Sequence, residues 1–252
     1  MAPPDPSERL LVALDVESLA DASALLDRLA GVLSRCKIGN QLFTAAGPAA
    51  VELARKRGFG VFLDLKFHDI PNTVAGAVRE ATRLGVFMLN VHASGGVAMM
   101  RAAAEAATKA ATDFGVPRPL CLGVTVVTSL DRRALDVEVG VPSTVEAHVL
   151  HLARLAREAG LDGCVASPRE ITPLRLALGK GWVIVTPGVR MLDRGAPTRP
   201  PGSPNADDQA RTATPAAAIR AGADYLVVGR PITAAPDPTA AARAILEECR
   251  QA

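Results

Sequence analysis

A carboxylate and an ammonium group stand two residues apart in the run that ends Asp64-Leu65-Lys66. If this run is a β-strand, alternate side chains leave the same face, so Asp64 and Lys66 lie side by side. At the carboxyl end of a strand in a parallel barrel, that face opens on the barrel mouth. A fixed cation there can stabilise developing negative charge and deliver a proton. Taken alone, such a pair is more often a structural ion pair.

Further polar side chains stand at or near the ends of other apolar runs. Asp15 closes the first run, Lys37 interrupts the second, and Asn90 and His92 close the fourth. Each has an ordinary explanation, since Asp15 can cap the next helix, Lys37 can reach solvent along its stem, and His92 can be a hydrogen-bonded strand-end histidine. Two anions and two cations at one barrel mouth, however, are more typical of an active site than of random surface.

The last two apolar runs end in an anion-binding pattern. Gly229 and Arg230 follow the eighth run, and Pro187 and Arg190 follow the seventh. Loops after strands seven and eight are the recurrent phosphate site of parallel barrels, where Gly exposes backbone N–H groups and Arg offers a bidentate guanidinium. These residues therefore predict a phosphorylated substrate. The segment Met191–Arg211, rich in Pro, Gly, Asp and Arg, is predicted to be a lid over that site rather than a disordered insertion.

The elements that would position these side chains recur along the chain. Eight β-rich runs begin about 31 residues apart, which is the length of one parallel βα unit. Segments of helical period lie between them, and no G-x-G-x-x-G or G-x-x-x-x-G-K-[ST] string occurs. We predict a single α/β domain over residues 1–252, a (β/α)8 TIM barrel. The runs begin at Leu10, Cys36, Val61, Phe87, Leu120, Gly163, Val183 and Tyr225, and helices are expected at Leu19–Leu33, Thr73–Leu84, Gly96–Phe114, Thr144–Glu158 and Pro238–Arg250.

Composition excludes several classes of protein. The 252 residues are 49% hydrophobic, so a large core is expected, while a net charge of +2 and 3% aromatic residues argue against nucleic-acid binding. No membrane span or leader is visible, and the four dispersed cysteines lack a Cys-x-x-Cys pair, which indicates a reducing, cytoplasmic setting. His148 and His151 share a helix face without further ligands at metal spacing, so no metal site is expected.

Strings spread over nearly the whole chain resemble the orotidine 5′-monophosphate decarboxylase family. In order they are LVALDV, CKIGNQLF, DLKFHDIPNT, NVHASGG, VTVVTS, VTPGVR, DDQAR and ADYLVVGRPIT. DLKFHDIPNT is highly specific, and the other strings follow in the order of the family. The resemblance implies a lyase that converts orotidine 5′-monophosphate (OMP) to uridine 5′-monophosphate (UMP) in pyrimidine biosynthesis, without metal or organic cofactor.

The same resemblance implies roles for individual residues. Lys66 would protonate the C6 carbanion left by CO2, in a row of alternating charge with Lys37, Asp64 and Asp69. The family forms homodimers with shared sites, which implies that Asp69 and Thr73 act on the ribose bound by the neighbouring subunit. The remaining implied contacts are Asp15 and Lys37 to the ribose, Thr128 and Ser129 to the pyrimidine, and Gly229, Arg230 and the lid residue Gln209 to the phosphate.

Two other functions fit parts of the pattern. A phosphosugar decarboxylase or aldolase of the same barrel suprafamily shares D-x-K-x-x-D but arranges its acidic residues around Mg2+. The continuation Ile70-Pro71-Asn72-Thr73 and the loop with Gln209 argue against it. A nucleotide-binding barrel without chemistry would not require a cation beside a carboxylate, so Lys66 argues against that function.

Overall fold

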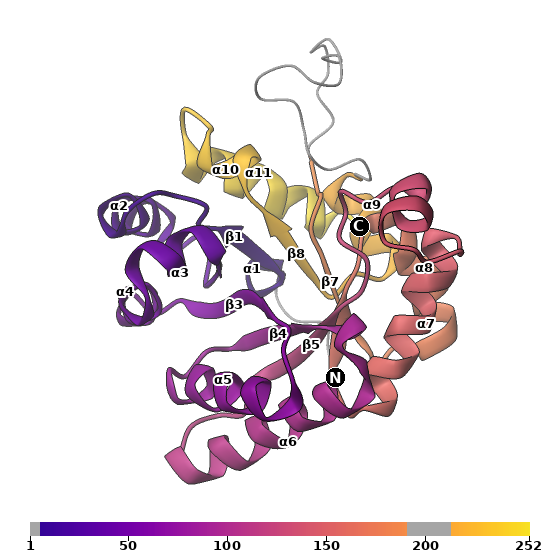
Figure 1. Ribbon diagram of the computed structural model, residues 1–252. Helices are drawn as coiled ribbons and strands as arrows, with labels where there is room; N and C mark the ends of the chain where they lie inside the picture. Colours follow the sequence, from indigo (N-terminus) through magenta and orange to yellow (C-terminus); the bar gives the residue numbers. More distant parts are fainter. Residues whose placement is uncertain (1–5, 191–212) are drawn as a thin grey trace.

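The computed structural model describes residues 6–190 and 213–252, and these residues build a closed barrel of eight parallel strands (Figure 1). The strands pair in chain order, and β1 closes the barrel against β8. Every predicted run begins within one residue of an observed strand, which confirms the predicted fold. The strands are β1 (Leu10–Ala13), β2 (Arg35–Gly39), β3 (Gly60–Phe67), β4 (Met88–His92), β5 (Leu120–Val124), β6 (Gly163–Val165), β7 (Val183–Thr186) and β8 (Tyr225–Val228).

Helices connect the strands and surround the barrel (Figure 1). The α-helices are α1 (Pro6–Arg9), α2 (Leu19–Leu29), α3 (Asn40–Ala46), α4 (Pro48–Lys56), α5 (Pro71–Arg83), α6 (Gly96–Phe114), α7 (Val145–Glu158), α8 (Ile171–Leu178), α9 (Pro215–Ala221), α10 (Arg230–Thr233) and α11 (Pro238–Arg250). Three short helical turns are η1 (Ala93–Gly95), η2 (Ala134–Glu138) and η3 (Pro168–Glu170). The predicted lid, Met191–Arg211, lies outside the described residues.

Local sequence explains where the helices begin and end. Ser18, at the start of α2, accepts a hydrogen bond from the backbone N–H of Asp21 at 3.1 Å. The Ser18 hydroxyl also donates to the Asp21 carboxylate at 2.6 Å. In a reciprocal capping box, the Ser18 backbone N–H would donate to that carboxylate instead. The helix stops earlier than its predicted end at Leu33 because Gly31 takes a left-handed conformation, with φ of 76°.

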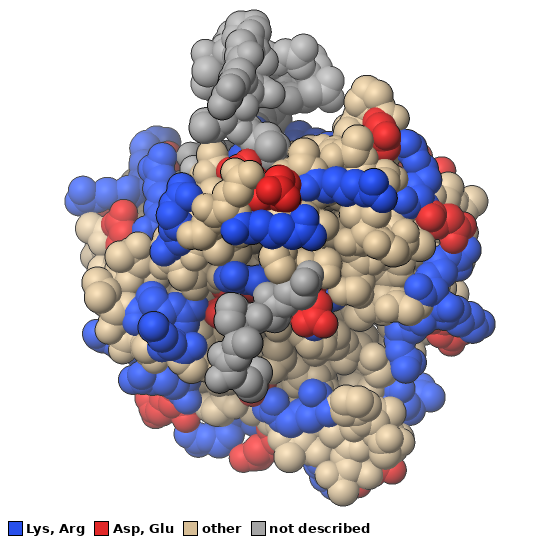
Figure 2. Space-filling view, turned by 180° about the vertical axis from the view of Figure 1, so that it is seen from behind, with Lys and Arg blue, Asp and Glu red and all other residues tan. Residues whose placement is uncertain are grey.

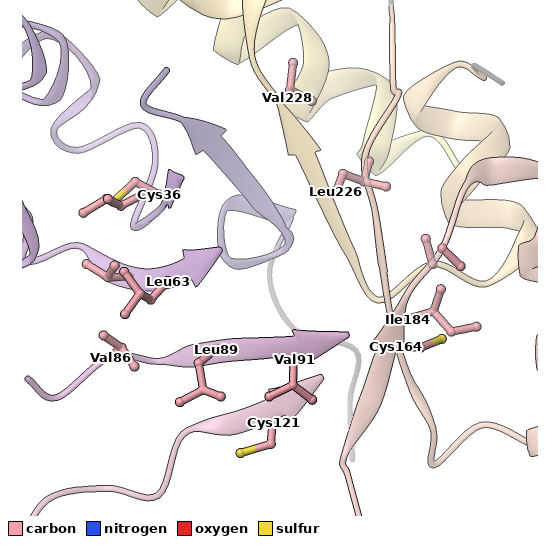
Figure 3. Close-up of a cluster of buried hydrophobic side chains, with 14 of the residues drawn as sticks. Cys36, Leu63, Val86, Leu89, Val91, Cys121, Cys164, Ile184, Leu226 and Val228 are labelled. Carbon is pink, nitrogen blue, oxygen red and sulfur yellow. The ribbon is translucent and has the colours of Figure 1, made fainter. Parts of the chain in front are cut away.

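Two apolar layers hold the barrel together. Side chains that leave the strands outward pack against the helices. Leu63, Leu89 and Ile184 are among those labelled in Figure 3. Side chains that point inward fill the barrel, among them Leu11, Phe62, Met88, Leu122 and Val185. The alternation of the two sets along each strand fills the interior of the barrel below its mouth, so no ligand can be held inside the barrel itself.

The four cysteines are free and buried, as their sequence spacing predicts. Near the amino end of β7, the buried indole N–H of Trp182 donates to Cys164 Sγ at 3.2 Å. Basic and acidic side chains are interspersed on the surface seen in Figure 2. Among the described residues, no helix is both long and apolar enough to cross a membrane.

Candidate active site

A cavity of about 700 Å³ opens at the mouth of the barrel, the end at which the strands finish. One side of this cavity is apolar, with Phe62, Val124, Val165 and Val227 among its lining residues. The structure brings most of the predicted site residues together around it. Those that line the cavity are Asp15, Lys37, Asp64, Lys66, Thr128, Pro187, Arg190, Gly229 and Arg230.

Four charged side chains form a continuous row along this cavity, and we call them the charge row: Asp15, Lys37, Asp64 and Lys66. Lys37 Nζ lies 3.0 Å from Asp15 Oδ1 and 3.4 Å from Asp64 Oδ2. Lys66 Nζ lies 2.7 Å from Asp64 Oδ1. The inner members are buried, whereas 55% of the Asp15 side chain and 30% of the Lys66 side chain are exposed. The two ends of the row are therefore open to a ligand.

The charge state of Lys37 follows from its neighbours. Burial by itself lowers the pKa of the Lys37 ammonium, because a low-dielectric environment disfavours the charged form. The carboxylates of Asp64 and Asp15 outweigh burial, so the pKa of Lys37 is raised above its ordinary value. The ammonium is charged at neutral pH and separates two carboxylates that would otherwise repel each other.

Strand β3 departs from the regular alternation that its sequence predicts. Leu63 pairs with Leu89 of β4 and Phe67 pairs with Val91, so the intervening residues of β3 bulge opposite Asn90 alone. Lys66 lies in this bulge with φ of 55°, and no other non-glycine residue of the described chain has a positive φ. The predicted contact between Asp64 and Lys66 is confirmed, but a bulge rather than a flat strand produces it.

Asn90 belongs to this site, whereas its position in the sequence indicates only a polar strand end. Its side chain is fully buried, and its Oδ1 accepts a hydrogen bond from the Lys66 backbone N–H at 2.8 Å. Its Nδ2 donates to Asp64 Oδ1 at 2.7 Å. A polar residue in the middle of the apolar string MLNVH was the available signal, since a buried amide needs partners.

His92 stands two residues beyond Asn90, and its ring centroid lies 5.5 Å from that of His68. Burial lowers the pKa of His92, and the nearby positive charges of His68 and Lys66 lower it further, against a smaller opposing effect of Asp64. A neutral imidazole therefore lies beside the cationic end of the charge row at neutral pH.

The predicted anion corner lies at the ends of β7 and β8. Gly229 and Arg230 begin the turn into α10, and Arg190 is held by a backbone hydrogen bond from its N–H to Ala213 O at 2.9 Å. Gly188, between Pro187 and Arg190, has φ of 78°, which favours glycine. Two guanidinium groups thus stand on neighbouring loops at the edge of the cavity, an arrangement suited to a phosphate group.

Three described residues of the predicted site do not line the cavity. Asp69 and Thr73 are exposed, at the start of α5, and do not line the cavity of their own chain. Asp69 Oδ1 accepts a hydrogen bond from the Ile70 N–H at 2.6 Å. Ser129 is exposed beside the cavity residue Thr128, and Gln209 lies outside the described residues.

A second cavity, of about 810 Å³, lies at the opposite end of the barrel between the ends of α2, α4 and α11. Arg57, Arg243 and Arg250 contribute to its wall. Its cations form separate ion pairs rather than a row as at the mouth: Arg57 pairs with Asp27, and Arg250 pairs with Glu247. No predicted site residue within the described part of the chain lies there, so the mouth is the better candidate for chemistry.

Comparison with known proteins agrees with this geometry. Residues 8–245 match the model of the "Orotidine 5'-phosphate decarboxylase / HUMPS family". The orotidine 5'-phosphate decarboxylase of Moorella thermoacetica is 57% identical over 241 residues, covering 96% of this chain and 92% of the relative. That of Halorhodospira halophila is 52% identical over 248 residues, 98% of each chain. A crystal structure of the Lactobacillus acidophilus orotidine 5'-phosphate decarboxylase superposes with a TM-score of 0.81 at 33% identity, covering 96% of this chain and 99% of that one.

Proposed function

This chain belongs to the orotidine 5'-phosphate decarboxylase / HUMPS family, and from that premise we propose how its barrel mouth performs the reaction. The reaction is the decarboxylation of OMP to UMP, a carboxy-lyase step of pyrimidine nucleotide biosynthesis. The observation that supports the assignment of the site is the charge row, in which an ammonium group lies at the exposed end of a buried ion network.

Loss of CO2 from C6 of the pyrimidine leaves an electron pair that no adjacent carbonyl group can delocalise. The site must therefore supply a fixed cation beside C6 and a proton for that carbon. Lys66 serves both needs: its ammonium stabilises the developing carbanion and then donates a proton to C6, which yields UMP. Its side chain is 30% exposed, so solvent can return the proton.

Asp64 acts on the ground state. Its carboxylate is positioned to lie next to the substrate carboxylate, and two such charges at ~4 Å repel by about 4 kcal/mol at an effective dielectric constant of ~20. Departure of neutral CO2 relieves this repulsion. Lys66 and Asn90 hold Asp64 Oδ1 at 2.7 Å each, so the carboxylate cannot easily turn away from the substrate.

Binding energy comes from parts of the substrate that do not react. Arg230, Gly229 and Arg190 at the ends of β7 and β8 are suited to the 5′-phosphate. Asp15 and Lys37 are assigned to the ribose hydroxyls; Asp15 is exposed, and Lys37 Nζ lies 3.0 Å from its carboxylate. Thr128 and Pro187 also line the cavity, and Thr128 is assigned to the pyrimidine.

The direct test follows the absorbance of OMP and release of CO2 after addition of the purified chain. We expect equimolar UMP and CO2, and undiminished turnover after dialysis against EDTA, because Lys66 rather than a Lewis acid meets the carbanion. Loss of activity on dialysis with recovery in Mg2+ would favour the metal-dependent phosphosugar lyase chemistry. Tight UMP binding without turnover would indicate a nucleotide-binding barrel.

We also propose a homodimer in which Asp69 and Thr73 complete the neighbour's site. Both residues are exposed and lie off their own cavity, and a two-fold interface lets one patch serve both partners. Inactive Lys66→Ala and Asp69→Ala proteins should regain activity when mixed, because one site of each heterodimer is then wholly wild type. Proven subunit exchange without recovery would place Asp69 in its own subunit's site.

A cytoplasmic location is proposed as well. The support is that all four thiols are free and buried, which suits a reducing compartment.

A further inference from the structure

Asn90 occupies the position from which one side chain can act on both partners of the Asp64–Lys66 pair. It lies on β4 opposite the bulge of β3, with its side chain fully buried. Its amide oxygen faces the backbone of Lys66 and its amide nitrogen faces the carboxylate of Asp64. The hydrogen-bonding chemistry fixes this orientation, since a backbone N–H can only donate and a carboxylate can only accept.

The conformation that Asn90 stabilises is an unfavourable one. A side chain with a Cβ rarely adopts a φ near 55°, as Lys66 does. Such backbone strain persists only where surrounding contacts hold it, and it concentrates at functional sites. The 2.8 Å bond from the Lys66 N–H to Asn90 Oδ1 lies at the strained residue itself. Lys66 therefore depends on a residue of the next strand for the direction in which its ammonium leaves the backbone.

The second bond of Asn90 limits the freedom of Asp64. Asp64 Oδ1 receives both Asn90 Nδ2 and Lys66 Nζ at 2.7 Å, while Oδ2 faces Lys37 Nζ at 3.4 Å. Without the amide, the carboxylate could rotate to follow either lysine. With the amide in place, Oδ1 is held on the Lys66 side and the carboxylate plane is fixed.

We infer that Asn90 is a positioning residue for the decarboxylation: it holds the Lys66 backbone in its left-handed conformation and orients the Asp64 carboxylate. Asn90 itself touches neither the ribose nor the phosphate contacts assigned above. Its loss should therefore lower kcat far more than it weakens binding of the nucleotide. The inference rests on the proposed roles of Lys66 and Asp64.

Asn90→Ala removes both hydrogen bonds, and misplacement of a catalytic group by about 1 Å costs roughly 100-fold in rate. We expect kcat to fall about 100-fold while the Kd for UMP, measured by calorimetry, changes less than about threefold. Asp162→Ala is the matched control. It removes a side chain that also bonds a neighbouring strand, through Cys121 N at 2.7 Å and Arg118, but at the opposite end of the barrel. Its kcat should stay near that of the wild type.

Asn90→Asp provides a second measurement, the pH dependence of kcat relative to the wild type, which would not change if Asn90 only supported the fold. The introduced carboxylate can still accept from the Lys66 N–H, but it has no proton for Asp64 and repels it. Protonation restores a donor, so the ratio of variant to wild-type kcat should rise as pH falls, whereas the ratio for Asn90→Ala should stay constant. The groups that face this position are Asp64 and Lys66 on β3, Lys37 beyond them on β2, and His92 on β4; the residue paired with it on β5 is the apolar Leu122. Asn90→Ala lacks the introduced carboxyl, so a pH dependence of the ratio that appears in Asn90→Asp and not in Asn90→Ala is caused by that carboxyl.

The outcomes separate the inference from the function on which it rests. A wild-type chain that does not decarboxylate OMP overturns the proposed function itself. A folded Asn90→Ala protein with kcat within threefold of an active wild type overturns the positioning role alone, as does an equal loss of kcat and UMP affinity. If Asn90→Ala does not fold, Asn90→Ser, which keeps a small polar group, is measured by the same two criteria.

Discussion

At the amino ends of the strands, which we call the floor of the barrel, Asp162 and Asp224 stand directly before β6 and β8. Asp162 Oδ2 accepts a hydrogen bond from Cys121 N at 2.7 Å, and Asp224 Oδ2 accepts one from Ile184 N at the same distance. An arginine pairs with each carboxylate: Arg118 lies 2.8 Å from Asp162 and Arg175 2.7 Å from Asp224. Each carboxylate thus joins a neighbouring strand to an arginine, and the same device occurs twice.

At the mouth, carboxylates and cations bind chiefly one another. Asp64 contacts two lysines and the Asn90 amide, and its carboxylate accepts no hydrogen bond from a backbone N–H of the described residues. Lys66 has a strained backbone, whereas the described floor residues have no positive φ outside glycine. The comparison shows that charge alone does not mark an active site. What distinguishes the mouth is that its charges depend chiefly on one another and line a cavity, while those of the floor are anchored to the backbone.

Substitution of Lys66 is the strongest test of the difference between the charges of the mouth and those of the floor. Lys66→Ala should lower kcat roughly 10³-fold or more, because both the cation and the proton donor are lost. The phosphate and ribose contacts are untouched, so UMP binding should be retained. Single-turnover decarboxylation and calorimetry with UMP measure the two quantities. A folded variant that keeps near-normal kcat would show that the mouth charges, like those of the floor, are structural.

The next largest effect is expected at the anion corner. Arg230→Ala should raise the barrier in kcat/KM for OMP by about 2–3 kcal/mol, the size of a lost charge-assisted contact. With the wild-type protein, kcat/KM for the phosphate-free nucleoside orotidine should be lower than that for OMP by a similar amount. Arg230→Ala should change kcat/KM for orotidine very little. Equal impairment of both substrates would mean that Arg230 supports the fold and not the phosphate.

At the floor, the expected effect moves from rate to stability. Asp224→Ala leaves the Ile184 N–H and the Arg175 guanidinium without the shared carboxylate, which should lower the free energy of unfolding by about 2 kcal/mol. Denaturant unfolding followed by circular dichroism measures this loss. The kcat of the folded variant should be unchanged, and a large drop in kcat would connect the floor to the chemistry.

The smallest effect concerns His92. Its pKa is lowered in the folded chain, so between that value and the ordinary value near 6.5 the unfolded chain binds more protons. Stability should therefore rise with pH through this window and fall on acidification from pH 7.5. His92→Gln should flatten the dependence. His148, whose pKa is also lowered by burial and by His151, contributes in the same direction, so His148→Gln is the comparison variant. If the pH dependence of the free energy of unfolding is unchanged in His92→Gln, a group other than His92 causes it.

Strand order and strand-end chemistry could be predicted because both are local. An apolar run such as Leu10–Ala13 needs only its own residues to indicate a buried strand, and Asp15, two residues after it, falls at the mouth by topology. The family resemblance added roles that no spacing supplies. For Asp69 and Thr73, which lie off their own cavity, only that resemblance suggests a use.

The bulge could not be predicted, because it depends on contacts between distant residues. Lys66 has no intrinsic preference for a positive φ, and the partner that stabilises it is 24 residues away on another strand. Asn90 can be polar and buried because both of its hydrogen-bond partners, Asp64 and Lys66, lie on β3. The sequence shows both Lys66 and Asn90, but it does not show that they are hydrogen-bonded to each other.

The bond from the Trp182 indole to Cys164 Sγ has a spectroscopic consequence. Trp182 is the sole tryptophan of the chain, and it is buried near the amino end of β7, away from the cavity at the mouth. Its fluorescence should therefore report the packing of the floor and stay largely silent when a nucleotide binds. A change in emission during turnover would mean that motion at the mouth passes through the whole length of the barrel.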